Sequence, residues 1–198
     1  MRRLEQNAKM NDLKRSMAGC TLCSDLPLGP RPIFKISSRV KILIAGQAPG
    51  RLAHISGKAF DDPSGDRLRR WLGVGREQFY DDPRLGILPM GLCFPGSGAR
   101  GDLAPRDICA QTWRSAALAS MTDIELTIIL GKHALAWHLP DQKRHTISQS
   151  VMKTFSINGP ELVMPHPSPR NAMWFKRQPW FETEMIPRLQ QKVRELLD

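Results

Sequence analysis

Val40-Lys41-Ile42-Leu43-Ile44-Ala45-Gly46-Gln47-Ala48-Pro49-Gly50 is the stretch that decides the fold class of this chain of 198 residues. Its apolar part, 40–45, is nearly continuous and rich in β-branched residues, as in a parallel strand that is buried on both faces. The loop that follows, 46–50, contains two glycines and a proline, so its main-chain N–H groups can face a ligand at close range. It has neither the G-x-G-x-x-G spacing of a dinucleotide-binding turn nor the Gly-Lys-Ser/Thr of a Walker loop. It is either a ligand loop of another kind or a tight strand-to-helix turn.

Apolar runs and helical patterns alternate along the rest of the chain. Three further runs predict strands, at 86–90, 126–130 and 161–164. Helical patterns predict helices at 3–17, 64–72, 107–118, 132–138 and 179–197. Ser64 is the expected N-cap of the second helix. Because strands that alternate with helices indicate a parallel sheet covered on both faces, we expect an α/β fold. It is expected to be a single domain over residues 1–198, a three-layer α/β/α sandwich with a central four-stranded parallel sheet.

The conspicuous loops all follow a predicted strand, at 46–50, 91–101, 131–133 and 165–171. The carboxyl ends of the strands are the edge at which open α/β sheets bind ligands. The last loop contains His166-Pro167-Ser168-Pro169-Arg170-Asn171, and its prolines exclude both a helix and a central strand. Such a stiff loop suits gripping a nucleic-acid backbone and presenting a histidine. The alternative is a proline-rich turn with a solvated histidine.

The composition points to a polyanionic partner. A formal net charge of +10 and a pI near 10.0 favour binding to nucleic acid, with a merely soluble basic enzyme as the alternative. The apolar content of 41% is enough for a core. No apolar run approaches the length of about 18 residues that a membrane span needs, and the N-terminus lacks the apolar segment of a signal peptide. We therefore expect a cytoplasmic protein with no membrane association, and a monomer.

The four cysteines form a second pattern. Cys20 and Cys23 have a spacing that lets two thiolates reach one metal from a single turn, and Cys93 and Cys109 enclose a basic, loop-like segment further along. With no cysteine left over, the count suits ligation of zinc or of an iron–sulfur cluster, and the spacing does not choose between them. Disulfides are not expected in a cytosolic chain, so four free buried cysteines are the alternative.

Together these motifs resemble the uracil-DNA glycosylase superfamily, and most closely its iron–sulfur branch, family four. The resemblance runs from Cys20 to Arg170. It consists of the C-x-x-C pair, the Gly-x-Ala-Pro-Gly loop 46–50, Phe60, the pair Cys93 and Cys109, Leu130-Gly131 with Ala134, and the His-Pro-Ser-Pro loop. It implies that the four cysteines hold a structural 4Fe-4S cluster near the DNA, with zinc as the less favoured metal.

The resemblance also implies roles in the chemistry for the residues of the pocket. His166 would donate a hydrogen bond to the departing base as negative charge develops on it. Main-chain groups of Gln47 and Ala48 would line the catalytic pocket, and Phe60 would stack on the flipped base. The other expected base-binding residues are Gly46 and Gly50.

Contacts to the DNA are implied in the last loop and in the cysteine loop. Ser168 would hold a phosphate, and Arg170 stands where relatives often carry a leucine wedge that fills the emptied base stack. A guanidinium at this position would also bind phosphate. The other expected DNA-binding residues are Asn171 and Arg100.

Three positions depart from the pattern of the relatives. Gln47 replaces a glutamate of family four, and Ala48 stands where the first uracil family has its water-activating aspartate. Asp61 or Asp62 could orient water instead. Pro89 replaces an asparagine that reads the uracil edge in relatives, so discrimination between bases by that side chain is lost.

These observations leave three functions open. The leading one is a monofunctional DNA glycosylase that acts on uracil or on another deaminated or modified base. The second is an iron–sulfur DNA-binding protein of the same fold without catalysis, which the missing asparagine and carboxylate favour. The third is a small-nucleotide hydrolase or binding protein, which the broadly basic composition disfavours.

Overall fold

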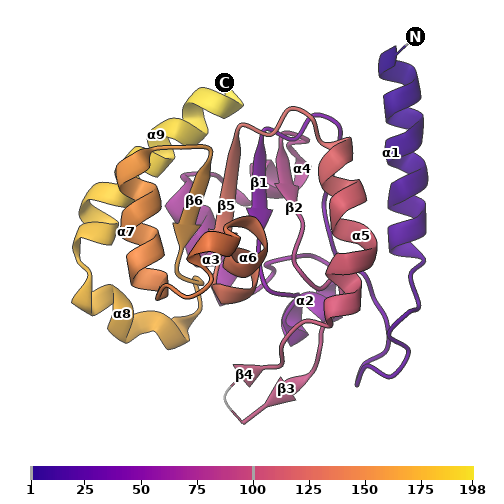
Figure 1. The fold of residues 1–198 in the computed structure, drawn as a ribbon, viewed down its shortest axis with the longest axis horizontal. Coiled ribbons are helices and arrows are strands. Elements are labelled where there is room, and N and C mark those ends of the chain that lie inside the picture. Colours follow the sequence, from indigo (N-terminus) through magenta and orange to yellow (C-terminus); the bar gives the residue numbers. More distant parts are fainter. Residues whose placement is uncertain (1, 100) are drawn as a thin grey trace.

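The computed structural model describes residues 2–99 and 101–198. Among them, a central sheet contains four strands that all run parallel: β1 (Ile42–Ala45), β2 (Leu85–Ile87), β5 (Leu126–Leu130) and β6 (Glu161–Met164). Their order in the sheet is β2-β1-β5-β6 (Figure 1). The expected α/β fold with a four-stranded parallel sheet is therefore confirmed.

The two inner strands, β1 and β5, are buried along their whole length. Ile44 of β1 lies opposite Ile87 on one side and Ile128 on the other, so β-branched side chains fill the centre of the sheet. Because both faces of these strands are covered, their sequences show a continuous apolar run and no alternation with polar residues.

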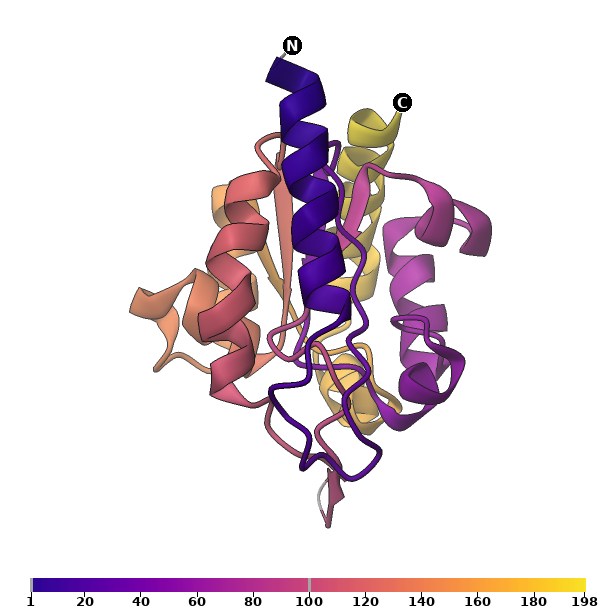
Figure 2. The same ribbon diagram turned by 90° about the vertical axis from the view of Figure 1, so that its right-hand side faces the viewer.

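Helices form a layer on each face of the sheet (Figure 2). One layer contains α3 (Pro63–Leu72), α4 (Arg76–Asp81) and α9 (Ile186–Leu197). The other contains α5 (Asp107–Ser120), α6 (Lys132–His138) and α7 (Ile147–Ile157), and α1 (Arg2–Ala18) packs against α5. Within the described part of the chain, no helix has the length and apolar character needed to cross a bilayer.

The carboxyl ends of the strands meet at one edge of the sheet, at the bottom of Figure 1. Short elements gather at this edge. They are α2 (Arg51–Ser56), the antiparallel hairpin of β3 (Ser97–Gly98) and β4 (Gly101–Asp102), the 3-10 turn η2 (Pro169–Asn171) and α8 (Ala172–Arg177). The loops that the sequence marked as conspicuous therefore come together on one side of the molecule.

The helix α3 begins one residue earlier than predicted, and its cap is a different residue. Asp62 is the N-cap: its Oδ1 accepts a hydrogen bond of 2.8 Å from the N–H of Gly65, and Pro63 takes the first helical position. The prediction that Ser64 caps this helix is wrong. Asp-Pro is a strong start signal, because the carboxylate pairs with the first turn and proline has no N–H to leave unpaired.

Other differences concern short elements and ends. The sequence did not predict α2, α4, α7 or α8, and the β3–β4 hairpin lies inside the segment 91–101 that was expected to be a loop. The strand β2 ends at Ile87, although the apolar run continues to residue 90. At the C-terminus, Phe181–Met185 form a π-helical turn, and regular α9 starts only at Ile186. Pro187 has no N–H to donate, so it fits the first turn of a helix and not its interior.

Candidate functional site

A pocket of about 500 Å³ opens at the carboxyl edge of the sheet, a size typical of small-ligand sites. The loop 46–50, the segment 59–64, the end of the β3–β4 hairpin and the loop after β6 form its walls. Nearly all of the expected base- and DNA-binding residues line it: Gly46, Gln47, Ala48, Gly50, Phe60, His166, Ser168, Arg170 and Asn171. Arg100 lies outside the described residues.

His166 is held in one protonation state by its own loop. Its Nδ1 lies 3.2 Å from the backbone N–H of Ser168, which donates to it. Burial lowers the pKa of the His166 imidazole below its ordinary value of 6.5, against the opposing charges of Asp62 and Asp102, and the charge of Arg170 lowers it further. At neutral pH the ring is therefore uncharged, and because Nδ1 accepts a hydrogen bond, the proton is on Nε2. This arrangement leaves Nε2–H as a donor.

The loop around His166 is fixed from two sides. The side-chain amide of Asn171 donates a hydrogen bond of 2.7 Å to the carbonyl oxygen of His166. Arg67, on α3, donates from Nη1 to the carbonyl oxygens of Pro167 at 3.2 Å and of Ser168 at 3.3 Å. Asn171 was expected to contact DNA, and this hydrogen bond gives it a further role, because it fixes the backbone of the histidine.

Phe60 lies across the pocket from the His166 loop with an unusual backbone. Its φ of 57° is in the left-handed region, which costs free energy for an aromatic residue. The backbone of Gly65 is so close that a Cβ atom there would lie 1.7 Å from the carbonyl oxygen of Phe60. The ring rests on the first loop, since a Cβ on Gly46 would lie 3.4 Å from its Cζ, and its centroid is 6.4 Å from that of His166.

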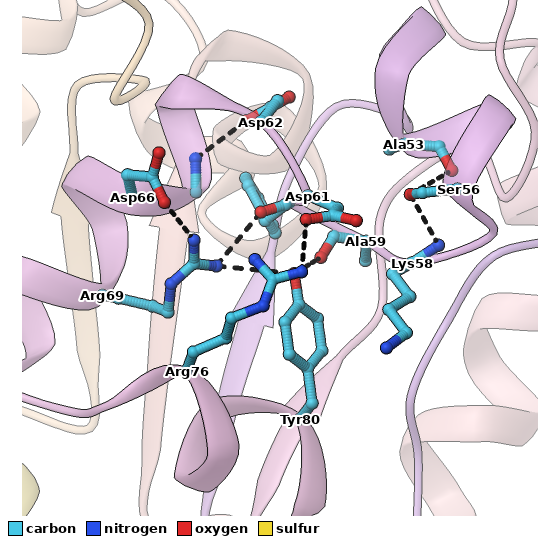
Figure 3. Close-up of polar contacts among 12 residues, drawn as sticks. Ala53, Ser56, Lys58, Ala59, Asp61, Asp62, Asp66, Arg69, Arg76 and Tyr80 are labelled. Atoms are coloured by element: carbon cyan, nitrogen blue, oxygen red, sulfur yellow. Dashed lines mark hydrogen bonds and ion pairs between the residues drawn. The ribbon is translucent and has the colours of Figure 1, made fainter.

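A polar network behind the pocket maintains this conformation (Figure 3). The buried Arg69 donates from Nη1 to the carbonyl oxygen of Phe60 at 3.2 Å, and the hydroxyl of Tyr80 donates to that of Ala59 at 3.1 Å. Asp61 belongs to the same network: it accepts a hydrogen bond of 2.7 Å from Arg76, which lowers the pKa of its carboxyl group. Asp61 is one of the two aspartates that the sequence offered for orienting water, and its carboxylate is paired with Arg76 instead.

Two carboxylates line the pocket near the first loop. Asp62 reaches it from the start of α3 and Asp102 from β4. A Cβ on Gly50 would lie 3.4 Å from Oδ2 of Asp102 and 3.8 Å from Oδ2 of Asp62, so the two oxygens flank the same point. The sequence did not predict Asp102 as a site residue. The one available signal was its place in a loop after the carboxyl end of a strand.

The first loop uses its carbonyl oxygens to hold the neighbouring chain. The N–H of Met90 donates to the carbonyl oxygen of Gly46, and that of Gly91 to the carbonyl oxygen of Gln47, both at 2.9 Å. The side chain of Gln47 donates from Nε2 to the carbonyl oxygen of Leu103 at 2.8 Å. Among the described residues, the backbone N–H groups of Gln47 and Ala48 have no hydrogen-bond partner, so they are available to a ligand.

Pro89 forms part of the pocket wall and has a buried support. Arg114, with 1% of its surface exposed, donates from Nη1 to the carbonyl oxygens of Leu88 at 2.9 Å and of Pro89 at 3.2 Å. Its Nη2 contacts Nε2 of His138. Burial lowers the pKa of Arg114 to about 10, and burial beside this cation lowers the pKa of His138 to about 3. The histidine is therefore neutral and accepts the hydrogen bond.

The four cysteines line a second cavity together, between the segment after α1 and the segment 91–109. Backbone and ring N–H groups donate to two of the sulfurs: Leu92 to Sγ of Cys109 at 3.2 Å, and Trp113 to Sγ of Cys20 at 3.4 Å. Burial, together with the other three thiols, raises the pKa of Cys93 to about 11. Four thiols that influence one another need a bound cation to be stable as thiolates.

The arrangement of the four thiols indicates which kinds of metal centre they could hold. Among the described residues, no three His, Cys, Asp or Glu side chains are arranged to share a single metal ion. The cysteines nevertheless line one cavity, with mainly apolar neighbours. Four sulfurs around one cavity, with N–H groups directed at two of them, are a donor set that fits an iron–sulfur cluster or a zinc ion.

The known proteins to which this chain is similar include a family and a solved structure. The model of the family described as the Uracil DNA glycosylase superfamily matches residues 34–190, which include both loops of the pocket. A solution NMR structure from Methanosarcina acetivorans, of a protein provisionally named a uracil DNA glycosylase, has 15% sequence identity and a TM-score of 0.49. The similarity covers 83% of this chain and 98% of that chain.

Proposed function

Because the chain belongs to the uracil DNA glycosylase superfamily, we propose that it is a monofunctional DNA glycosylase. It hydrolyses the N-glycosidic bond of uracil, or of another deaminated or modified base, in DNA. The observation that carries this proposal is the fixed state of His166, which offers an Nε2–H donor in a pocket large enough for a base.

The chemistry requires a donor of this kind. The target base leaves the DNA stack, which costs a few kcal/mol and is easiest at a mispaired site. As the glycosidic bond breaks, negative charge develops on the base, and a fixed donor beside the charged oxygen lowers the barrier. The neutral imidazole of His166 supplies such a donor, and the N–H of Ser168 keeps it from rotating. Phe60 stacks on the base, and the N–H groups of Gln47 and Ala48 provide further donors at the pocket wall.

The rim of the pocket suits a DNA backbone. Arg170 is exposed at this rim, and it packs so closely over Gly101 that a Cβ there would lie 2.5 Å from Nη1. The hydroxyl of Ser168 accepts from the N–H of Arg170 at 3.3 Å and retains its own proton to donate to a phosphate. The net charge of +10 supports the same partner.

The base preference is expected to be broad. Pro89 stands in the pocket wall and offers no side-chain donor, so the base edge is read by main-chain N–H groups and by shape. We infer that this enzyme accepts more than one deaminated base.

The cysteine cavity supports a resident cofactor. Cys20, Cys23, Cys93 and Cys109 would hold a 4Fe-4S cluster. When bound, such a cluster would tie the segment after α1 to Cys93 and to the first turn of α5, and it would take no part in breaking the glycosidic bond. The N–H groups of Leu92 and Trp113 stabilise the charge of the sulfurs.

A second function remains a specific alternative. A DNA-binding protein of this fold without catalysis is favoured by Ala48 and Pro89, which remove two side chains that take part in the chemistry of relatives. A protein for small nucleotides is less favoured, because a mononucleotide does not need a broadly basic surface.

The decisive experiment is a panel of duplex and single-stranded oligonucleotides that carry uracil, hypoxanthine, xanthine or mispaired thymine, scored for abasic sites. We expect free base from at least one lesion, and a loss of about 100-fold or more in the single-turnover rate of His166→Ala. His145→Ala, at an exposed histidine away from the pocket, is the matched control. Salt-sensitive duplex binding without base release would support the inactive alternative, and binding of mononucleotides alone would support the third.

A further inference from the structure

The proposed hydrolysis needs a group that positions water, and position 48 is an alanine. Among the described residues, the pocket wall contains two carboxylates, Asp62 and Asp102, and neither forms a salt bridge. By contrast, Asp61, the neighbour of Asp62 in sequence, is paired with Arg76 at 2.7 Å. Asp62 is half-buried and Asp102 is exposed, and both line the pocket without a paired cation, so their charges are available to a ligand there.

Each carboxylate is anchored by one oxygen. Oδ1 of Asp62 accepts a hydrogen bond of 2.8 Å from the N–H of Gly65, at the start of α3. Oδ1 of Asp102 accepts one of 3.1 Å from the hydroxyl of Ser97, across the β3–β4 hairpin. The second oxygen of each has no hydrogen-bond partner within the described chain. Because one oxygen of each carboxylate is held by a hydrogen bond, the position of its second oxygen, which could accept a hydrogen bond from a ligand, is fixed as well.

The two second oxygens converge. They flank Gly50, where a Cβ would lie 3.4 Å from Oδ2 of Asp102 and 3.8 Å from Oδ2 of Asp62. Both carboxylates also act on the pKa of His166, and Asp62 has the larger effect. The two carboxylates are therefore close enough to His166 to interact with it electrostatically. The charge of Arg170 acts on the same imidazole in the opposite direction.

We propose that Asp62 and Asp102 together hold and activate the attacking water in place of a carboxylate at position 48. This inference rests on the proposed glycosylase function. Asp62, whose side chain is fixed as the N-cap of α3, is the general base and accepts one proton of the water. Asp102 accepts a hydrogen bond from the second hydrogen of the water and so orients it. The negative pair also stabilises the positive charge that develops on the deoxyribose as the bond to the base weakens.

The step balances without a further reactant. The bond between C1′ of the deoxyribose and the base nitrogen breaks, and its electron pair leaves with the base, whose oxygen accepts from Nε2–H of His166. The water oxygen forms a new bond to C1′ and gives one proton to Asp62. That proton then passes through solvent to the released base, which leaves a neutral base and an abasic site. Asp62 returns to its carboxylate form for the next turnover.

The test compares isosteric variants in single-turnover cleavage of the best lesion duplex. Asp62→Asn is isosteric, and Asp62→Ser has a shorter side chain. Both asparagine and serine can cap the N-terminus of α3, so each variant removes the carboxylate and keeps the cap. Asp102→Asn is the partner variant, and Asp141→Asn, at an exposed carboxylate that does not line the pocket, is the matched control. Thermal unfolding and the Kd for the lesion duplex are measured for each variant.

The expected result separates catalysis from binding. Each of the Asp62 and Asp102 variants should slow cleavage at least tenfold, and the double variant by about 100-fold or more, the usual contribution of a general base. Their Kd should be unchanged or tighter, since removal of negative charge near a phosphate backbone favours binding. Asp141→Asn should stay within about twofold of the wild type, as expected for a group outside the chemistry.

Two outcomes would overturn the inference in different ways. If Asp62→Asn and Asp102→Asn cleave at the wild-type rate while His166→Ala is inactive, the carboxylates do not activate water and the glycosylase function stands. If the wild-type protein releases no base from any oligonucleotide, both the function and the role of the aspartates are wrong.

Discussion

The backbones of Gly65 and Phe60 touch, with no room for a side chain between them. A Cβ atom on Gly65 would lie 1.7 Å from the carbonyl oxygen of Phe60. This contact, together with the hydrogen bond from Arg69, holds Phe60 at a φ of 57°. The ring that we assign to base stacking is thus placed by the first turn of α3.

Gly65→Ala is expected to destabilise the protein and to displace Phe60. The added methyl group has only backbone to push against, so we expect the free energy of unfolding to fall by about 2–3 kcal/mol or more. Urea unfolding measures this loss. Gly75→Ala is the control, since a Cβ there meets nothing within 4 Å, and it should cost less than about 1 kcal/mol. Equal losses in the two variants would contradict the contact.

The pH dependence of cleavage should reflect a histidine that stays neutral below its ordinary pKa. Burial lowers the pKa of His166, so the neutral ring persists as the pH falls through 6.5. Protonation at Nδ1 would break the hydrogen bond from Ser168, and the stability that this group contributes is lost as the pH falls through its lowered pKa. We expect single-turnover rates to be flat from about pH 8 to below 6.5 and then to fall. A midpoint at or above 6.5 would show that the ring is not held neutral.

Arg170 should affect DNA affinity through charge. Arg170→Ala is expected to weaken binding to lesion and undamaged duplexes alike, and to reduce the slope of log K against log salt by about one. Titrations at several salt concentrations measure this slope. Lys153→Ala, at an exposed cation on α7, serves as control and should leave it unchanged. A loss restricted to the lesion duplex would instead indicate a wedge without a phosphate contact.

The cysteine cavity makes a prediction about metal content. Protein purified without oxygen should be brown, with absorption near about 400 nm, and should contain iron. Cys109→Ser should lose iron and lower the Tm by about 5 °C or more, because the ligand set and the hydrogen bond from Leu92 are both weakened. Ser24→Ala, an exposed neighbour of Cys23, is the control. A colourless protein with stoichiometric zinc would contradict the cluster.

The sequence was most informative where local pattern and burial agree. The run 40–45 predicted β1 because a strand covered on both faces admits few polar residues, and the prolines on either side of Ser168 predicted a stiff loop for similar local reasons. Residues that reach the site through contacts between segments distant in sequence show no local pattern that would predict their positions. Asp102 enters the pocket only because a hairpin forms within the cysteine loop, and Arg114 supports Pro89 from another helix. Local pattern also could not show that the side chain of Asn171 donates to the carbonyl oxygen of His166 within the same loop.

The segment 88–92 connects the pocket to the cysteine cavity, and this limits which substitutions the protein can accept there. Arg114 fixes one end, at Leu88 and Pro89, and the N–H of Leu92 at the other end donates to Cys109. Within this segment, Pro89 lines the pocket, and Gly91 and Leu92 line the cysteine cavity. A substitution that reshapes the pocket here is therefore expected also to shift the sulfur of Cys109. We expect the shape of the pocket and the position of this sulfur to change together in evolution, because one short segment carries both.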